Sequence, residues 1–191
     1  IDLSLGSAAA GTVNLNAGGT VNNVAALTIA DRHTQTNAGT LNNDGTLTID
    51  GTIDNIGTLN NSGTLDLRAE ATFGTEGGTL NNNAGGIIEL GIDLDLGTDE
   101  AGTVNLNAGG TLNNAAELEI IAGHTQTNAG VLNNTNTFSN HGTLDNDGTL
   151  NNHGTLDNHG TLNNDGTLNV AYMIENRRNS TLNNSGTLNV T

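Results

Sequence analysis

A six-residue repeat, Gly-Thr-Leu-Asn-Asn-x, constrains this 191-residue chain more than any other feature of its sequence. Its apolar third position recurs in two unbroken runs, which are Leu41, Leu47, Ile53, Leu59 and Leu65, and then Leu144, Leu150, Leu156, Leu162 and Leu168. A longer repeat has a period of 91 residues, because Ile1-Asp2-Leu3 returns as Ile92-Asp93-Leu94 and GTVNLNAGGT returns unchanged at residue 102. Repetition at fixed spacing predicts a solenoid or an array.

The hexad predicts short β-strands and not helices. A six-residue period does not match the 3.6-residue helical turn, and Gly, Thr and Asn are poor helix formers. The order small, polar, apolar, polar places one side chain inward and its neighbours outward. Asn-x-Gly then supplies the corner, because Asn and Gly tolerate left-handed backbone angles. Successive coils would stack as parallel strands, with Leu on Leu inside and asparagine ladders at the corners.

The number of hexads in one coil is left open by the sequence. Two observations favour a flat, two-sided coil of two hexads, or about 12 residues. The inward positions Val13, Val21, Leu27, Gln35 and Leu41 are spaced 8, 6, 8 and 6. The second hexad run, counted from Leu132 to Leu168, covers 36 residues, whereas the first, from Leu41 to Leu65, covers 24, a difference of two hexads. A three-sided coil of three hexads, or about 18 residues, encloses a core better. We predict an all-β, three-sided parallel β-helix, with the flat solenoid as the alternative.

Composition and charge exclude several classes of protein. Asn (34), Thr (29), Gly (27) and Leu (24) make up 114 residues, and so few residue types cannot interlock a compact, irregular core. The net charge of −16 argues against nucleic acids and against anionic membranes, both of which attract basic surfaces. The absence of cysteine excludes disulfides and thiol catalysis, and no apolar run reaches the roughly 20 residues that span a bilayer.

The hexads of the form GTLNN-S/D/H-G, with the longer GTVNLNAGG arms, resemble the stalk repeats of large exported bacterial surface proteins. These are autotransporter passenger domains and filamentous-haemagglutinin-like adhesins. The resemblance covers nearly the whole chain. It implies a right-handed parallel β-helix, a place outside the cell or on the bacterial surface, and a role in adhesion or matrix building.

We interpret the chain as one continuous solenoid over residues 1–191, with internal repeats at 1–91 and 92–191. One segment interrupts the six-residue rhythm after each hexad run: residues 68–78 follow the first run and residues 170–180 follow the second. The second segment reads VAYMIENRRNS and contains the candidate partner-contact residues Tyr172, Arg177 and Arg178. Its two arginines would meet an acidic partner, most simply the surface of a neighbouring copy.

The corner positions of the second hexad run form a candidate pH-sensitive ladder, because they read His141, Asp147, His153, His159 and Asp165. A three-hexad coil would stack His141 on His159 and Asp147 on Asp165. A two-hexad coil would instead place His141, His153 and Asp165 in one column. Protonation would therefore act differently in the two forms, since His meets His in one and Asp in the other.

No catalytic, cofactor-binding or metal-binding constellation emerges from the sequence. The acidic residues are scattered over outward and corner positions, whereas a glycosidase would need carboxylates gathered on one face. The segment Asp145-Asn146-Asp147-Gly148 resembles a calcium loop only faintly, since it has no distal Glu, and we interpret it as a solvated turn. We predict that the chain is not an enzyme and has no cofactor.

The sequence therefore predicts a structural and interaction segment of a secreted bacterial surface adhesin or extracellular fibre. The expected partners are host or matrix glycans and other copies of the chain, which would associate laterally or end to end. End-to-end association is expected because both end sequences read as ordinary strand. The alternative is an ice-binding solenoid that uses outward Thr-x-Asn rows spaced roughly 6.8 Å along the strand and 4.8 Å between coils. A thermal-hysteresis measurement separates the two functions.

Overall fold

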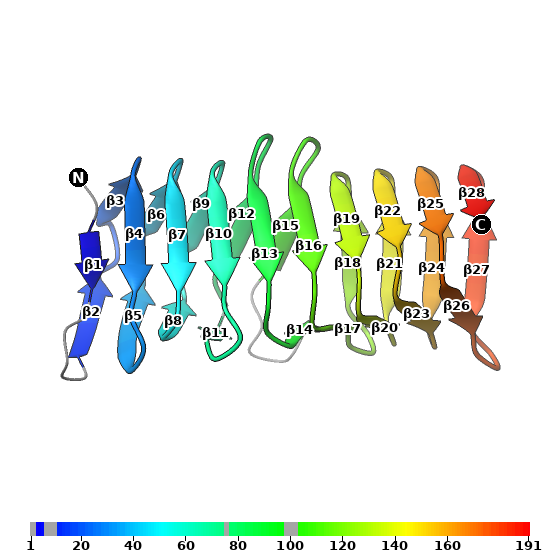
Figure 1. Cartoon of the computed structure of the whole chain (residues 1–191), viewed down its shortest axis with the longest axis horizontal. Coiled ribbons are helices and arrows are strands. Elements are labelled where there is room, and N and C mark those ends of the chain that lie inside the picture. The colour runs from blue at the N-terminus through cyan, green and yellow to red at the C-terminus, as the bar shows by residue number, and fades with distance from the viewer. Residues whose placement is uncertain (1–2, 6–10, 75–76, 98–102) are drawn as a thin grey trace.

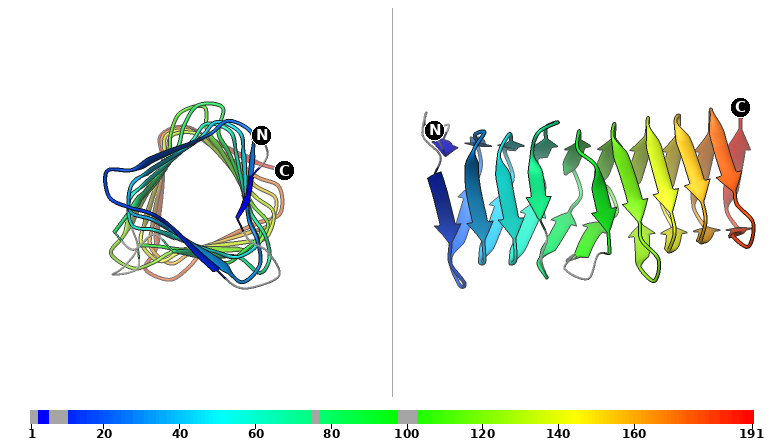
Figure 2. Two further views of the ribbon diagram at one scale, coloured as in Figure 1. Left: turned by 90° about the vertical axis from the view of Figure 1, so that its left-hand side faces the viewer. Right: turned by 90° about the horizontal axis from the view of Figure 1, so that it is seen from below.

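A computed structural model describes residues 3–5, 11–74, 77–97 and 103–191 as a three-sided stack of parallel β-strands (Figure 1). The chain follows one face, then the next, then the third, and returns to the first one coil further along the axis. The left view of Figure 2 looks along this axis and shows the three-sided outline. No helix among the described residues is long and apolar enough to cross a membrane.

Two long sheets form two of the faces. The ten-stranded sheet contains β1 (Leu3–Leu5), β4 (Ala26–Ile29), β7 (Thr46–Ile49), β10 (Thr64–Leu67), β13 (Ile87–Leu90), β16 (Thr111–Asn114), β19 (Val131–Asn134), β22 (Thr149–Asn152), β25 (Thr167–Val170) and β28 (Thr187–Val190). The nine-stranded sheet contains β3 (Thr20–Asn23), β6 (Thr40–Asn43), β9 (Thr58–Asn61), β12 (Thr79–Asn82), β15 (Thr103–Leu106), β18 (Thr125–Asn128), β21 (Thr143–Asn146), β24 (Thr161–Asn164) and β27 (Thr181–Asn184).

The third face is divided into two shorter sheets. The first contains β2 (Gly11–Leu15), β5 (His33–Asn37), β8 (Thr52–Asn55) and β11 (Thr72–Gly74). The second contains β14 (Leu94–Leu96), β17 (Glu117–Ile120), β20 (Thr137–Asn140), β23 (Thr155–Asn158) and β26 (Met173–Asn176).

The register confirms the three-sided coil, and the flat alternative is wrong. Within each sheet, neighbouring strands are three apart in chain order, so that Thr46 lies beside Thr64 and Thr149 beside Thr167, three hexads later. The spacing is larger where corners are longer, as between Ala26 and Thr46. The 8-and-6 rhythm that favoured a flat coil comes from such corners, because residues 16–19 and 30–32 are longer connections than a hexad provides.

The 91-residue repeat does not contain a whole number of coils. β1 of the first repeat corresponds to β14 of the second, 13 strands later, which is four coils plus one face. The unit HTQTN, which occurs at residues 33–37 and again at 124–128, consequently lies on the third face in β5 and in the nine-stranded sheet in β18, where the strand covers Thr125–Asn128. The two extra hexads of the second run add two strands. They return the following segment to its original face, so that β10 and β25 both belong to the ten-stranded sheet.

The second and fourth residues of most strands point inward, as the alternating burial pattern of β21–β25 shows. The second position holds the predicted aliphatic residues, of which Leu144, Leu150 and Leu156, one on each face of a coil, are at most 1% exposed. Each stacks on the residue three hexads later, as Leu144 does on Leu162. The fourth position was expected at a corner, but it lies in the core. It holds either an aliphatic residue, such as Ile49, or a fully buried asparagine, such as Asn152.

Hexad corners require glycine for a different reason from the predicted one. The left-handed glycines lie in longer corners, as Gly18 and Gly123 do. In a plain hexad the backbone of one coil approaches that of the previous coil closely. A Cβ built on Gly160 would lie 2.0 Å from the carbonyl oxygen of Gly142, so any side chain would collide with main chain.

Replacing Arg32 by Gly is expected to stabilise the fold by about 0.5–1 kcal/mol. Arg32 has a φ of 64°, in the left-handed region that L residues disfavour, and the corresponding residue of the second repeat is Gly123 with a φ of 86°. Urea unfolding of the two proteins measures the difference. Arg32→Ala is the control, since it removes the same charge but retains a Cβ, and a gain of equal size in that variant would contradict the explanation.

Candidate interaction surface

Buried asparagines at the fourth strand position form hydrogen-bonded columns through the core, here called the inner ladders. In every one, the side-chain amide nitrogen donates to the side-chain oxygen of the asparagine one coil later, over 2.6–2.8 Å. The same nitrogen often donates to a strand carbonyl as well, as Asn146 does to Thr167 at 2.9 Å. The ladders therefore tie each corner to the following coil, and buried amides without such partners would be costly.

Four inner ladders start directly after an aliphatic residue of the preceding coil. Leu15, Leu90, Leu106 and Ile120 lie one coil before Asn37, Asn114, Asn128 and Asn140. The side-chain oxygens of Asn37, Asn128 and Asn140 are buried and accept no hydrogen bond from the described residues, whereas that of Asn114 accepts from the Ala116 amide at 3.3 Å. An inner ladder of this kind therefore begins at the coil in which asparagine first replaces an aliphatic residue at the fourth strand position.

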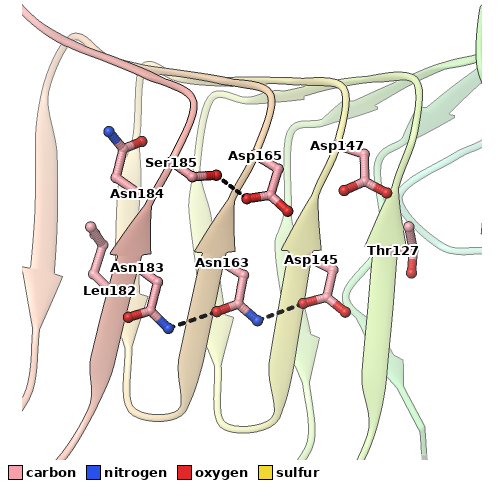
Figure 3. A pocket seen from close by; sticks show the side chains of 9 residues that line it. All are labelled: Thr127, Asp145, Asp147, Asn163, Asp165, Leu182, Asn183, Asn184 and Ser185. Carbon is pink, nitrogen blue, oxygen red and sulfur yellow. Dashed lines mark hydrogen bonds between the residues drawn. The ribbon is translucent and has the colours of Figure 1, made fainter.

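Asparagines at the third strand position form a second set of columns on the surface, here called the outer ladders. They run in the opposite direction, because each nitrogen donates to the previous coil, as Asn60 does to Asn42 at 2.9 Å. Two outer ladders begin at a carboxylate: Asn113 donates to Glu89 at 2.8 Å and Asn163 to Asp145 at 2.7 Å. The resulting surface is a fixed polar array along the axis (Figure 3).

Arg68 and Arg177 each bind one carboxylate of their own coil and one of the preceding coil. Arg177 follows β26 and donates to both oxygens of Asp157, with its Nε 2.6 Å from Oδ1 and its Nη2 2.7 Å from Oδ2. It also lies 2.5 Å from the Glu175 carboxylate. Arg68 follows β10 and joins Asp66 and Asp50, at 2.9 and 3.3 Å. These hydrogen bonds raise the pKa of both guanidinium groups.

The Asp157 carboxyl is expected to contribute stability that depends on pH. The hydrogen bond from Arg177 holds the pKa of Asp157 below its usual value, burial opposes this effect, and His159 adds to it. A carboxyl with a lowered folded pKa stabilises the fold above its unfolded pKa of about 3.9, and the contribution is lost as pH falls through the folded value. Wild type should therefore exceed Asp157→Asn in unfolding free energy at pH 7, by a margin that shrinks toward pH 3.

The control for this prediction is the same substitution in an Arg177→Ala background. Removing the guanidinium removes the main cause of the shift, so the pH-dependent margin produced by Asp157→Asn should become smaller there. Denaturant unfolding of the four proteins at several pH values provides the comparison. A margin that stays constant between pH 7 and pH 3 in the wild-type background would contradict the assignment.

The structure does not bring the predicted contact residues Tyr172, Arg177 and Arg178 together. Tyr172 precedes β26 and is 73% exposed, whereas the arginines follow this strand. Arg177 is occupied by Asp157 and Glu175 of its own chain. Arg178 is exposed. Within the described part of the chain, the two ends of β26 are thus separate surfaces.

Of the predicted histidine ladder, the structure assembles one pair. The rings of His141 and His159 stack with centroids 4.4 Å apart and an interplanar angle of 27°, as a three-hexad coil predicts. The Nδ1 atom of His141 lies 2.9 Å from Glu119, and the Nε2 atom of His159 lies 3.2 Å from Asp157. His153 follows β22 and occupies a different corner of the prism.

A shallow acidic groove is the feature that the sequence interpretation missed (Figure 3). It has a volume of about 670 Å³ and gathers Asp145 beside Asp147 and Asp165. The three-hexad coil predicts that Asp147 stacks on Asp165, but the addition of Asp145 to this pair was not predicted. Asp145 accepts from Asn163, and Asp165 accepts from the Ser185 hydroxyl. The signal that could have revealed the groove is the outward third position of Asp145 in its strand, next to the predicted Asp147–Asp165 stack.

The segment 145–148 does not form a calcium loop. Asn146 points into the core and donates to Asn164 and Thr167, while Asp145 and Asp147 lie on the outside. Its three potential ligands therefore do not converge. Among the described residues, no group of three or more His, Asp or Glu side chains could hold a metal ion.

The comparison with protein families agrees with this architecture. The model of the haemagglutinin repeat matches residues 2–69, 51–99 and 75–191, which together span nearly the whole chain. No curated protein and no solved structure matches the chain significantly. A parallel three-sided solenoid built from tandem hexads, with this match along its length, shows that the chain belongs to the haemagglutinin repeat family.

Proposed function

We propose that this chain is a structural and interaction segment of a secreted bacterial surface adhesin or extracellular fibre. The observation that carries the proposal is the combination of the family match with a stack whose inner and outer surfaces are both ordered by amide ladders. Such a stack provides reach and a long polar surface, and each coil depends only on its neighbours. Adhesion or matrix building needs both properties and requires no catalytic centre.

The outer ladders support this function over ice binding. Asn133, Asn151 and Asn169 donate to one another along the ten-stranded sheet, so their amides are already engaged within the protein. We propose further copies of the chain and matrix glycans as partners, because a polar array of this kind offers repeated hydrogen-bonding groups. Measurable thermal hysteresis would favour the ice-binding alternative instead.

Labelling of intact cells tests the proposal. Antibodies raised against this chain should stain intact cells of the source bacterium, and external protease should remove the signal. Deleting the segment should reduce attachment of these cells to a matrix-coated surface while leaving growth unchanged. Staining only after permeabilisation, or attachment that does not change on deletion, would contradict the proposal.

A further inference from the structure

The His141–His159 stack joins two successive coils at the corner between the third face and the nine-stranded sheet. His141 follows β20 and His159 follows β23, and their ring centroids are 4.4 Å apart. The side chains are 39% and 40% exposed, so solvent protons reach both rings. Imidazole is the side chain whose charge ordinarily changes between pH 5 and pH 8, and protonation of both rings would place two like charges at this contact.

Charged groups face the stack from three strands of the third face. Glu119 of β17 lies beside His141, and Asp157 of β23 lies beside His159. Arg177, after β26, holds Asp157 and also contacts Glu175 of that strand. On the other side, the corner continues into β21 and β24 through Gly142 and Gly160, which carry no side chain. The titratable residue at the corresponding place one coil earlier is His124, which precedes β18.

The carboxylates determine which ring nitrogens carry protons. Glu119 accepts from Nδ1 of His141, and Asp157 accepts from Nε2 of His159, so each neutral ring has its proton on the bonded nitrogen. A further proton must enter at the opposite nitrogen of each ring. With both rings neutral, three carboxylates (Glu119, Asp157, Glu175) and one guanidinium (Arg177) give the cluster a charge of −2, which two protons bring to zero.

We propose that the His141–His159 pair is a proton-operated contact between coils, stacked while at most one ring is charged and separated when both rings are charged. Two parallel imidazolium rings at stacking distance repel each other, and each has a carboxylate of its own to approach. The ring contact between the coils is then lost, while each ring keeps the bond to its own carboxylate, which becomes charge-assisted.

The surroundings indicate that His141 is the ring that moves. Glu119 belongs to the coil before His141, on the side away from His159, so attraction to this carboxylate draws the ring out of the stack. Asp157 is held on both oxygens by Arg177 and stays in place. The lowered pKa of Asp157 keeps its carboxylate ionised in the weakly acidic range, where it still accepts from His159.

NMR of the histidine-labelled chain tests the proposal, with ring-to-ring nuclear Overhauser contacts and ring-current shifts as the readout. The contact between His141 and His159 should be present at pH 8 and lost at pH 4.5, while strand amide signals stay unchanged. His153 provides the control within the same protein, because it follows β22 at a different corner and stacks on no ring among the described residues. Nitrogen shifts of each ring report its charge independently.

Glu119→Gln is the matched variant, since it removes the anion that draws His141 away and preserves the shape of the side chain. Its stack should survive to lower pH than the stack of the wild type. The proposal is overturned if the rings of the folded wild type remain in contact at pH 4.5, or if no ring contact exists at pH 8. It is also overturned if Glu119→Gln loses the stack at the same pH as wild type.

Discussion

Replacing Asn146 by Asp should destabilise the fold by about 3–5 kcal/mol at neutral pH, because a buried charge would face hydrogen-bond acceptors. Asn146 is 1% exposed and accepts from Asn128 at 2.6 Å. It also donates to Asn164 at 2.6 Å and to the Thr167 carbonyl at 2.9 Å. A carboxylate can replace the first interaction but neither of the others. Urea unfolding at pH 7 measures the loss.

The same variant should recover stability on acidification. Burial and the neighbouring oxygens disfavour the charged form, so the pKa of the introduced carboxyl is raised in the folded state. The destabilisation is then present at pH values above the folded pKa and diminishes as pH falls through it, because a protonated carboxyl can donate. Unfolding at pH 7, 6 and 5 should show the variant approaching wild type.

Asn151→Asp is the control, since Asn151 belongs to an outer ladder on β22, the next strand in the chain. It is only half-buried, donates to Asn133 at 2.8 Å and accepts from Asn169. Solvent reaches this surface, and Asp145 and Asp157 occupy equivalent outer positions. The expected loss is below about 1 kcal/mol. Equal losses in the two variants would show that the inner ladder has no special role in stability.

Deleting residues 143–160 should preserve the solenoid, because this segment consists of three hexads and makes one complete coil. Gly142 would then connect to Thr161, and β24 would take the place of β21 in the nine-stranded sheet. All later strands keep their faces, and stability falls only by the contribution of one coil. We expect a melting temperature within about 5 °C of wild type by circular dichroism.

A deletion of half that length should have a far larger effect. Removing residues 143–151 leaves a coil with too few residues for three faces, so the strands that follow cannot pair with their partners in register. The C-terminal coils should lose protection from protease, and the cooperative melting transition should weaken or disappear. Comparable melting of the two deletions would mean that coil length is not what holds the strands in register.

The sequence alone was sufficient for the architecture because the hexad is a local rule. An apolar residue every six positions, with glycine between, can only be buried by stacking like coils, and the buried stacks of Leu144 on Leu162 and of Leu150 on Leu168 confirm this. The stacking of His141 on His159 also followed from sequence spacing, once three hexads were taken as one coil.

Two features depended on contacts between residues far apart in sequence: the number of hexads in one coil and the hydrogen-bond partners of the inner ladders. The inward direction of Asn146 was missed because a polar residue at a corner suggests solvent, whereas here the next coil supplies its hydrogen-bond partners. The two extra hexads of the second run suggested a flat coil, but they add two strands and return the segments that follow to the face that their counterparts occupy in the first repeat.

The surface clusters were decided by tertiary structure for the same reason. Asp157 and Arg177 are 20 residues apart, and so are Asp145 and Asp165, whereas a plain coil has 18 residues. In both pairs the two residues occupy different positions of their hexads, one in a strand and the other in a corner. Sequence determines which side chains face outward on each strand. Which of them become neighbours depends on the length of every corner in the intervening coil, because each added residue shifts the register in which coils stack.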